Sequence, residues 1–468
     1  MTLETFDLLI IGAGPAGLSA ALEARRHGLS VALLDEQRSP GGQIYRNIDH
    51  SDPQRLAILG ADYQAGLRLS QAFMACGARY IAGAAVWQVT PQKQVHYLLD
   101  GRAYVLQARR LLIATGAYER PMPIPGWTLP GVMTAGAGQI LLKSAALLPA
   151  APVILAGCGP LLYLLAVQYL RAGIALAALV DTSSHADALR AWRQLPKALR
   201  GWRDLLKGVS LLASLRRAGV KHYRGARDLA IEGEEQAQAL RFSSGGVERR
   251  IPASLILLHQ GVVPNTQISW SLRLQHHWSS EQLCWSVERD AWGETSLAGI
   301  FIAGDSGAIG GALVAQQQGR LAALAIVGQL QRLAAPAIEA LAKPYRHALA
   351  RQLAARPLLD ALYRPPLESR VPADSVIVCR CEEVSAGDVR QHVDLGCLGP
   401  NQTKAFGRCG MGPCQGRLCG LSVTEVIAER RGVCPEQVGY YRIRSPLKPI
   451  TLAQLASEPT ASALQESL

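Results

Sequence analysis

The sequence lacks the features of a secreted or membrane-spanning protein. Its N-terminus has no basic segment followed by an apolar core and a cleavage site, so we expect no signal peptide and a cytoplasmic protein, with peripheral contact to the inner membrane left open. Residues 144–170 carry no charged side chain, but prolines and glycines interrupt them, so we expect buried core rather than a membrane helix. Six of the ten cysteines fall between residues 379 and 419, which is not the pattern of a disulfide framework.

Acidic residues are also scarce. The chain has 36 Asp and Glu against 48 Lys and Arg, giving a formal charge of +12. This balance indicates either an anionic partner, such as a nucleotide, an acidic protein face or a membrane surface, or simply a solvated basic surface. No nucleic-acid-binding module appears, so we expect no nucleic-acid partner. A length of 468 residues is enough for about three domains.

The N-terminal segment has the pattern of a dinucleotide-binding βαβ unit. An apolar run over residues 6–11 leads into a glycine-rich turn at residues 12–17. A helical segment follows, and a second apolar run ends at Asp35. The first glycine permits the tight turn, the second admits a pyrophosphate, and the third allows close helix packing. Asp35 is placed to accept hydrogen bonds from a ribose. The turn reads Gly12, Ala13, Gly14, Pro15, Ala16 and Gly17.

A second unit with the same pattern begins at residue 153. It contains Gly157 and Gly159, and Asp181 follows at the ribose position, but Leu162 replaces the third glycine. The unit predicts an adenine-nucleotide site. A retained fold with an empty or repurposed site is the alternative.

Two further glycine turns complete a family pattern. They are Ala114-Thr115-Gly116, and Gly304-Asp305 after an apolar run. Together with the two units, they make residues 5 to about 330 resemble the two-dinucleotide-binding-domain flavoproteins, which include the pyridine nucleotide–disulfide reductases. The resemblance implies an α/β fold with two Rossmann-like domains. It implies that FAD is held by the first unit, including Asp35 and Glu36, by both turns, and by a loop over the flavin that contains Gly41, Gly42 and Gln43.

One departure from that family concerns its redox chemistry. The disulfide reductases carry a redox-active cysteine pair beside the flavin, whereas Cys76, Cys158 and Cys284 are isolated here. We therefore expect electrons to leave the flavin by another route.

Four C-terminal cysteines predict that route. Cys379-x-Cys381 and Cys409-x4-Cys414 supply four thiolates without a histidine, which suits a [2Fe–2S] cluster or tetrahedral zinc. The CxC pair and the glycine-rich loop favour the cluster. A helix predicted to begin near Pro413 would turn Cys419 about 140° away from Cys414, so we interpret Cys419 as core.

This module resembles the [2Fe–2S] domain of bacterioferritin-associated ferredoxin. Module and flavoprotein together resemble the α subunits of heteromeric amino- and imino-acid dehydrogenases, a group with opine oxidases, D-hydroxyproline and L-proline dehydrogenases and a hydrogen cyanide synthase subunit. The resemblance implies a partner β subunit whose own FAD oxidises the substrate, and in some members a small γ subunit. In some members of the group, an FMN lies at the subunit interface. In some, a nucleotide site of the α subunit holds ATP or NAD, and the resemblance implies the same possibilities here. The final electron acceptor stays open.

Residues 188–224 form a strongly basic stretch. They hold ten Lys or Arg and a single acid, Asp204. Apolar residues recur three or four positions apart, which predicts a pair of amphipathic helices. A solvated face over a packed apolar stripe, a docking surface for a partner protein and a membrane-binding surface are the three interpretations.

We divide the chain as follows. Residues 1–120 and 260–335 form the FAD-binding domain, 121–259 the second nucleotide-binding domain, 336–374 a linker, 375–436 the [2Fe–2S] domain and 437–468 a tail. The favoured function is an electron-transferring subunit of a dehydrogenase, with no catalytic residue of its own for substrate oxidation. The alternatives are a subunit that oxidises glycine to cyanide, a self-sufficient NADH-dependent reductase and a structural subunit that holds ATP.

Overall fold

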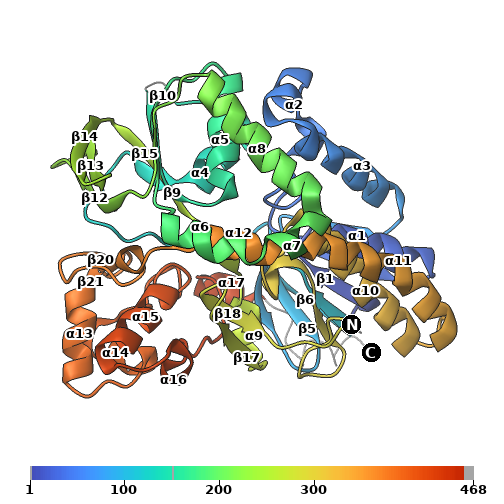
Figure 1. The fold of residues 1–468 in the computed structure, drawn as a ribbon. Coiled ribbons are helices and arrows are strands. Elements are labelled where there is room, and N and C mark those ends of the chain that lie inside the picture. Colours follow the sequence, from blue (N-terminus) through green and yellow to red (C-terminus); the bar gives the residue numbers. More distant parts are fainter. Residues whose placement is uncertain (1–2, 150–151, 458–468) are drawn as a thin grey trace.

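The computed structural model describes residues 3–149 and 152–457. Its largest sheet has seven strands, in which β1 lies between the parallel strands β2 and β6. Helices α1 and α10 pack together beside this sheet (Figure 1). The strands are β1 (Thr5–Ile11), β2 (Val31–Asp35), β3 (Arg79–Ala82), β4 (Ala85–Val89), β5 (Gln94–Leu99), β6 (Arg102–Ile113) and β19 (Ile300–Ile302). The accompanying helices are α1 (Pro15–Arg26), η1 (Ile48–His50), α2 (Pro53–Leu59), α3 (Ala61–Ala75), η3 (Gly304–Ser306) and α10 (Ala312–Gln329).

A second, five-stranded parallel sheet repeats the plan with the order β11-β10-β9-β15-β8. Its strands are β8 (Val132–Thr134), β9 (Val153–Cys158), β10 (Leu176–Asp181), β11 (His222–Tyr223) and β15 (Leu255–Gln260). An antiparallel sheet of β12 (Arg227–Glu232), β13 (Ala239–Ser244) and β14 (Val247–Pro252) adjoins it. Its helices are α4 (Ala135–Ala145), α5 (Pro160–Arg171), α6 (His185–Trp192), α7 (Leu195–Ala198), η2 (Leu199–Gly201) and α8 (Trp202–Arg217). The two-sheet α/β architecture confirms the predicted fold class.

A short antiparallel pair connects the two sheets. β7 (Ala117–Glu119) leaves the first sheet and pairs with β16 (Val262–Pro264), which returns to it. The hairpin of β17 (His276–Ser279) and β18 (Cys284–Val287) follows α9 (Gln267–Ser271). Each crossing between the domains is thereby fixed by strand pairing.

The C-terminal third begins with an arm and ends in a small helical domain. Figure 1 shows the arm across the front of the molecule and the helical domain below the second sheet. The arm contains α11 (Ala335–Leu353), α12 (Arg356–Leu362) and η4 (Leu367–Ser369). The helical domain contains β20 (Ile377–Cys379), β21 (Val384–Ser385), α13 (Ala386–Asp394), α14 (Pro400–Gly407), α15 (Gly420–Arg431) and α16 (Pro435–Val438), and α17 (Leu452–Ala456) lies in the tail.

Local sequence signals explain several boundaries. Ser385 and Asp388 form the predicted capping box at the start of α13, each satisfying a free backbone N–H group. The apolar run from residue 153 is the buried strand β9 followed by α5. No helix in the described ranges is long and apolar enough to cross a membrane.

The segment assigned to the tail continues the core of the cysteine domain. Tyr441, Ile443 and Leu447 are buried in one cluster with residues of the first sheet and of α15. The backbone N–H of Leu447 donates to the carbonyl of Trp87, at 2.7 Å. Residues 440–447, here termed the C-terminal strap, therefore join the cysteine domain to the first sheet.

Candidate functional site

The first glycine loop and the two later turns meet at one edge of the first sheet. Ala114 donates its N–H to Ile11, and a side chain on Gly12 (φ 108°) would approach the Ala114 carbonyl to 2.4 Å. Gly304 lies against Ala16, because a Cβ on Gly304 would stand 3.0 Å from that methyl group. Pro15 begins α1 at its first turn. The structure thus brings together three motifs that are distant in sequence, at the carboxyl edge where such folds bind ligands.

This first cradle is open. Gly14 is partly exposed, and a Cβ built on it would meet no atom within 4 Å. Gly17 is different, since its Cβ would stand 2.0 Å from the Gly12 carbonyl oxygen. One glycine therefore keeps space free above the helix N-terminus, and the other lets helix and strand pack closely.

Two carboxylates shape the ends of the cradle. Asp35 accepts hydrogen bonds from the N–H groups of Ala13 (2.6 Å) and Gln37 (2.7 Å), and burial raises its pKa. Asp305 accepts from Gly310 and Gly311, both at 2.9 Å, and so leads the chain into α10. Two other residues predicted to bind FAD have protein partners. Glu36 forms an ion pair with Lys448, just beyond the C-terminal strap, and the Thr115 hydroxyl donates to the Asn265 carbonyl.

The predicted loop over the flavin lies directly on the first glycine loop. Gly41 donates its N–H to the Ala13 carbonyl at 2.8 Å, and a Cβ on Gly42 would stand 2.8 Å from the Gly14 Cα. Lys143 of α4 reaches this loop from the second domain and donates to the Gln43 carbonyl at 3.2 Å. Burial lowers the pKa of Lys143 to about 7. Sequence reasoning missed this lysine, since nothing local marks it.

The second glycine loop is closed by the protein itself. Gly157 and Gly159 are both buried, and a Cβ on Gly159 would stand 3.1 Å from Nε2 of the His259 ring. His259 is held in place by Glu119, whose Oε1 lies 2.6 Å from His259 Nδ1. The thiol of Cys158 donates to the Tyr363 carbonyl of the arm, at 3.5 Å. The imidazole and the arm thus cover the turn where a pyrophosphate is expected.

The ribose position of the second unit is also occupied from within. Asp181 is buried, and its Oδ2 accepts the hydroxyl proton of Tyr163 at 2.5 Å. Its Oδ1 accepts from the backbone of Ser183, and its hydrogen bonds to His222 and Tyr163 keep its pKa below the usual range although burial opposes them. Asp181 therefore has partners of its own in place of a ribose.

Five thiols gather in the C-terminal domain. The sulfur atoms of Cys379, Cys409 and Cys419 all lie within 4.8 Å of one another. Cys414 contacts Cys419, and Cys381 contacts Cys414. The four spacing-predicted cysteines thus lie near one another, together with a fifth.

The prediction that Cys419 points away from the others is wrong. It assumed a helix from about Pro413, but residues 413–419 form turns and α15 begins only at Gly420. Gln415 and Gly416 have φ values of 52° and 79°, which a right-handed helix does not contain. These turns bring Cys419 back toward Cys414 and Cys379.

The surroundings of the thiols favour the ionised, ligand-competent form at two of them. Hydrogen bonds from Cys409 and Cys419 lower the pKa of Cys379 to about 2, and Cys419 lowers that of Cys414 to about 5. Cys379, Cys409 and Cys419 are buried, whereas Cys381 is exposed. The set therefore lies at the protein surface with one edge open.

A buried aromatic contact joins the thiol set to the first cradle. Tyr118 lies three residues beyond Thr115 and shares a hydrogen bond with Tyr440 of the C-terminal strap. Tyr440 donates to the Gly416 carbonyl at 3.3 Å, two residues from Cys414. The two candidate cofactor sites are thus connected through a continuous packed region.

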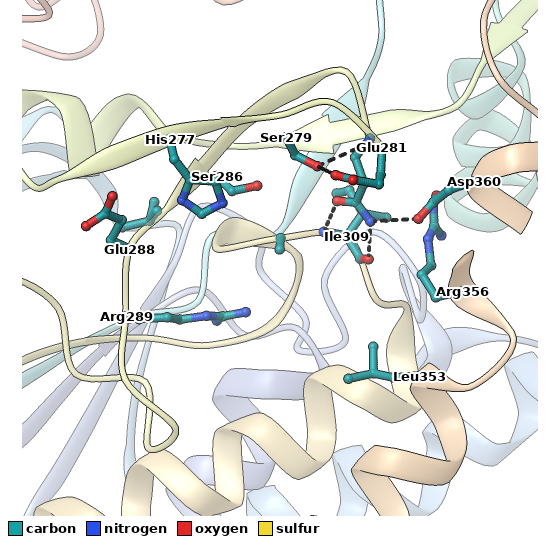
Figure 2. Close-up of a pocket in the computed structure, with 13 residues that line it drawn as sticks. His277, Ser279, Glu281, Ser286, Glu288, Arg289, Ile309, Leu353, Arg356 and Asp360 are labelled. Atoms are coloured by element: carbon teal, nitrogen blue, oxygen red, sulfur yellow. Dashed lines mark hydrogen bonds and ion pairs between the residues drawn. The ribbon is translucent and has the colours of Figure 1, made fainter. Parts of the chain in front are cut away.

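The arm and the β17–β18 hairpin line an open pocket of about 630 Å³ beyond the Asp305 turn. Figure 2 shows Arg289, Arg356 and Asp360 around it. Arg289 donates to the Ile302 carbonyl at 3.1 Å, and burial lowers its pKa to about 10. The cavity lies within the size range of small-ligand sites, but its wall contains none of the predicted site residues.

Comparison with known families agrees with this arrangement. The model of the pyridine nucleotide-disulphide oxidoreductases matches residues 6–319, and the sarcosine oxidase A3 domain matches residues 374–458. The chain belongs to the pyridine nucleotide-disulphide oxidoreductase family. Since the first match covers both sheets and the second covers the thiol set, the predicted family resemblance is confirmed.

Individual relatives extend the similarity over the whole chain. An opine oxidase subunit of Agrobacterium tumefaciens (strain Ach5) is 46% identical over 99% of this chain and 94% of that protein. Hydrogen cyanide synthase subunit HcnB of Pseudomonas aeruginosa is 32% identical over 94% of this chain and 96% of that protein. Among solved structures, L-proline dehydrogenase from P. horikoshii superposes with a TM-score of 0.69 at 19% identity, covering 97% of this chain and 80% of that one. The chain is therefore a member of the group that contains this opine oxidase subunit.

Proposed function

We propose that this chain is the electron-transferring subunit of a heteromeric enzyme that oxidises an amino or imino acid of the opine, proline or hydroxyproline type. The full-length similarity to the opine oxidase subunit supports this assignment. A partner β subunit then carries the substrate-oxidising flavin, and a γ subunit or an interface FMN completes the complex in some related enzymes. The chain itself provides cofactor positions and no substrate-oxidising residue.

The first cradle fits FAD. Gly14 leaves open space above the N-terminus of α1, and Gly12, Ala16 and Gly304 lie at its edge. Asp35 and Asp305 lie at its two ends, where a ribose and a polyol phosphate require acceptors or backbone support. These residues would hold the pyrophosphate and position the flavin beside Gly42 and Gln43.

The thiol set fits a [2Fe–2S] cluster. When bound, FAD and the cluster supply the electron exchange, and the protein sets their position and surroundings. Cys379, Cys381 and Cys414 are ligands in every arrangement that we consider. Spacing predicts Cys409 as the fourth, but contacts favour Cys419, which touches Cys379, Cys409 and Cys414. Cys409 instead accepts a hydrogen bond from the Tyr441 hydroxyl, at 3.4 Å.

The observation that carries the electron-transfer role is the packed connection between the two sites. Tyr118 follows the Ala114–Gly116 turn directly and contacts Tyr440, which packs beside the cysteine loop. The exposed Cys381 leaves the other edge of the cluster accessible to a partner. An electron path from a partner through this chain needs both features.

The second unit gives little support to an NADH-dependent reductase or to a subunit that binds ATP there. Its turn is covered by His259 and its ribose carboxylate is bonded to Tyr163. A glycine-oxidising, cyanide-producing complex keeps the same architecture in this chain, since subunit HcnB is similar over nearly its full length. Substrate choice in either case belongs to the partner.

Serine substitutions of the five cysteines test the cluster assignment. We expect Cys379→Ser, Cys381→Ser and Cys414→Ser to abolish bound iron and its visible absorption in the anaerobically purified chain. Of Cys409→Ser and Cys419→Ser, one should lose iron and the other retain it, and the contacts predict loss for Cys419→Ser. Zinc in place of iron, or full iron in all five variants, would contradict the proposal. Cys434→Ser is the matched control, because Cys434 is exposed and apart from the set.

A further inference from the structure

Helices α6, α7 and α8 carry two apolar faces, and only one of them is packed. Leu211, Leu212 and Leu215 of α8 join the main core, and Leu195 and Leu205 pack with α12. These contacts are sufficient to hold the helices on the domain. A packed stripe alone, as in the simplest sequence interpretation, therefore does not explain the remaining apolar residues.

The second apolar face is exposed to an unusual degree. Leu189 and Trp192 of α6 are 73% and 72% exposed, and they lie three positions apart on that helix. Trp202, Leu206 and Val209 of α8 are 53%, 56% and 63% exposed, at spacings that place them on one helix face. Large apolar side chains at such spacing on a surface indicate a binding face.

The same helices are strongly basic. Eight Lys or Arg lie between residues 185 and 217, all of them exposed, against the two acids Asp187 and Asp204. Asp187 is occupied by the α6 capping box and by Arg190. Within the described ranges, no carboxylate pairs with Arg193, Lys197, Arg200 or Arg203. The face therefore combines exposed tryptophan and leucine with cations that lack a carboxylate partner among the described residues.

We propose that α6–α8 bind the surface of an anionic lipid bilayer. Trp and Leu side chains enter the headgroup–acyl boundary while flanking Lys and Arg contact the lipid phosphates, which is how amphipathic interfacial helices bind. A protein interface fits less well, because charged residues are depleted at the core of such interfaces, whereas a Lys or Arg directly follows each of Leu189, Trp192, Trp202 and Leu206. Figure 1 shows α6, α7 and α8 on the outside of the molecule, with α12 and α5 beside them.

Co-sedimentation of the purified full-length chain with vesicles tests this proposal. We expect binding to vesicles of equal parts phosphatidylglycerol and phosphatidylcholine, weak binding to phosphatidylcholine alone, and release at high salt. The triple variant Trp192→Ser, Trp202→Ser, Leu206→Ser should bind at least about tenfold more weakly. The triple variant Arg193→Glu, Lys197→Glu, Arg200→Glu should also bind these vesicles at least about tenfold more weakly than the wild type.

A matched control lies on the cysteine domain. Leu395, Leu398 and Phe406 are 63%, 59% and 56% exposed, and their triple serine variant should bind vesicles like the wild type. The variant Trp192→Phe, Trp202→Phe should keep its binding but lose the blue shift of tryptophan emission on adding vesicles. Circular dichroism confirms that each variant is folded.

Two results would overturn the proposal. One is equal sedimentation of wild-type and triple-serine chains with anionic vesicles. The other is a triple-serine chain that keeps vesicle binding but no longer co-purifies with a co-expressed partner subunit, which would assign the face to a protein. Because no cofactor enters this assay, its outcome is independent of the proposed electron-transfer function.

Discussion

At the scale of single residues, Gly14 and Gly159 occupy equivalent positions in two similar turns but have opposite surroundings. Nothing lies within 4 Å of a Cβ built on Gly14, whereas a Cβ on Gly159 would touch the His259 ring. His259 comes from the end of β15, about 100 residues further along the chain. No local pattern around Gly159 predicts it.

Gly14→Val is expected to fold normally and to lose FAD, because its Cβ meets no protein atom within 4 Å and the side chain would occupy the open cradle. Gly17→Val, in contrast, should fold poorly, since its Cβ would overlap the Gly12 carbonyl. The released flavin absorbance after desalting measures the first effect, and thermal unfolding measures the second. Full flavin retention by Gly14→Val would exclude this turn as the site.

Lys143 predicts a pH-dependent stability. Its pKa falls from 10.5 in the unfolded chain to about 7 in the fold, because burial disfavours the charge. Between these values the unfolded chain binds the extra proton, so this site's contribution to stability increases as pH rises from about 7 to about 10. The unfolding free energy of the wild type relative to Lys143→Met should therefore rise over that range, by at most about 4 kcal/mol. Urea unfolding at several pH values measures it, and a pH-independent difference would contradict the assignment.

At the scale of elements, the sequence predicted the strand–helix–strand core of each nucleotide-binding fold. It failed at α15, where Pro413 and the following residues have the composition of a helix start. The left-handed conformations of Gln415 and Gly416 delay the helix to Gly420, and these are stabilised by packing on Tyr441 that sequence spacing does not reveal. The position of Cys419 depends on this difference.

The C-terminal strap predicts a second effect at this scale. Tyr441 is fully buried, and its hydroxyl lies 3.4 Å from Cys409 Sγ and 3.7 Å from Cys419 Sγ. Tyr441→Ala should cost about 3–5 kcal/mol of stability, as for other large buried aromatic residues, and should loosen the cysteine loop. Leu452→Ala is the control, because Leu452 is 86% exposed. Equal unfolding midpoints for the two variants would contradict a structural role for the strap.

At the scale of the whole molecule, the arm and the strap connect parts that the sequence presents as separate modules. The arm, predicted as a linker, contains two helices and covers the second glycine loop at Tyr363. The strap joins the thiol set to the first sheet. The exposed thiol of Cys381 and the open first cradle therefore belong to parts of the molecule that pack against each other.

The isolated chain is expected to be inactive toward amino acids and to show no rapid flavin bleaching by NADH. The first expectation follows from the absence of a predicted substrate-oxidising residue, and the second from the covered second loop. Anaerobic spectra of the flavin-loaded chain measure both. When the chain is co-expressed with its partner subunit, its flavin should become reduced on adding the substrate. Fast reduction by NADH alone would favour the self-sufficient reductase.

The sequence by itself determined the order of glycine turns, the two nucleotide-binding folds and the cysteine-rich C-terminal segment, because these depend on local backbone conformation and on short spacings. Only the tertiary structure decided that one cradle is open and the other closed, that Cys419 joins the thiols, and that the apolar stripe of α6–α8 is exposed. Each of these outcomes depends on side chains that come from distant segments. Their meeting is set by the packing of whole elements, which residue spacing does not encode.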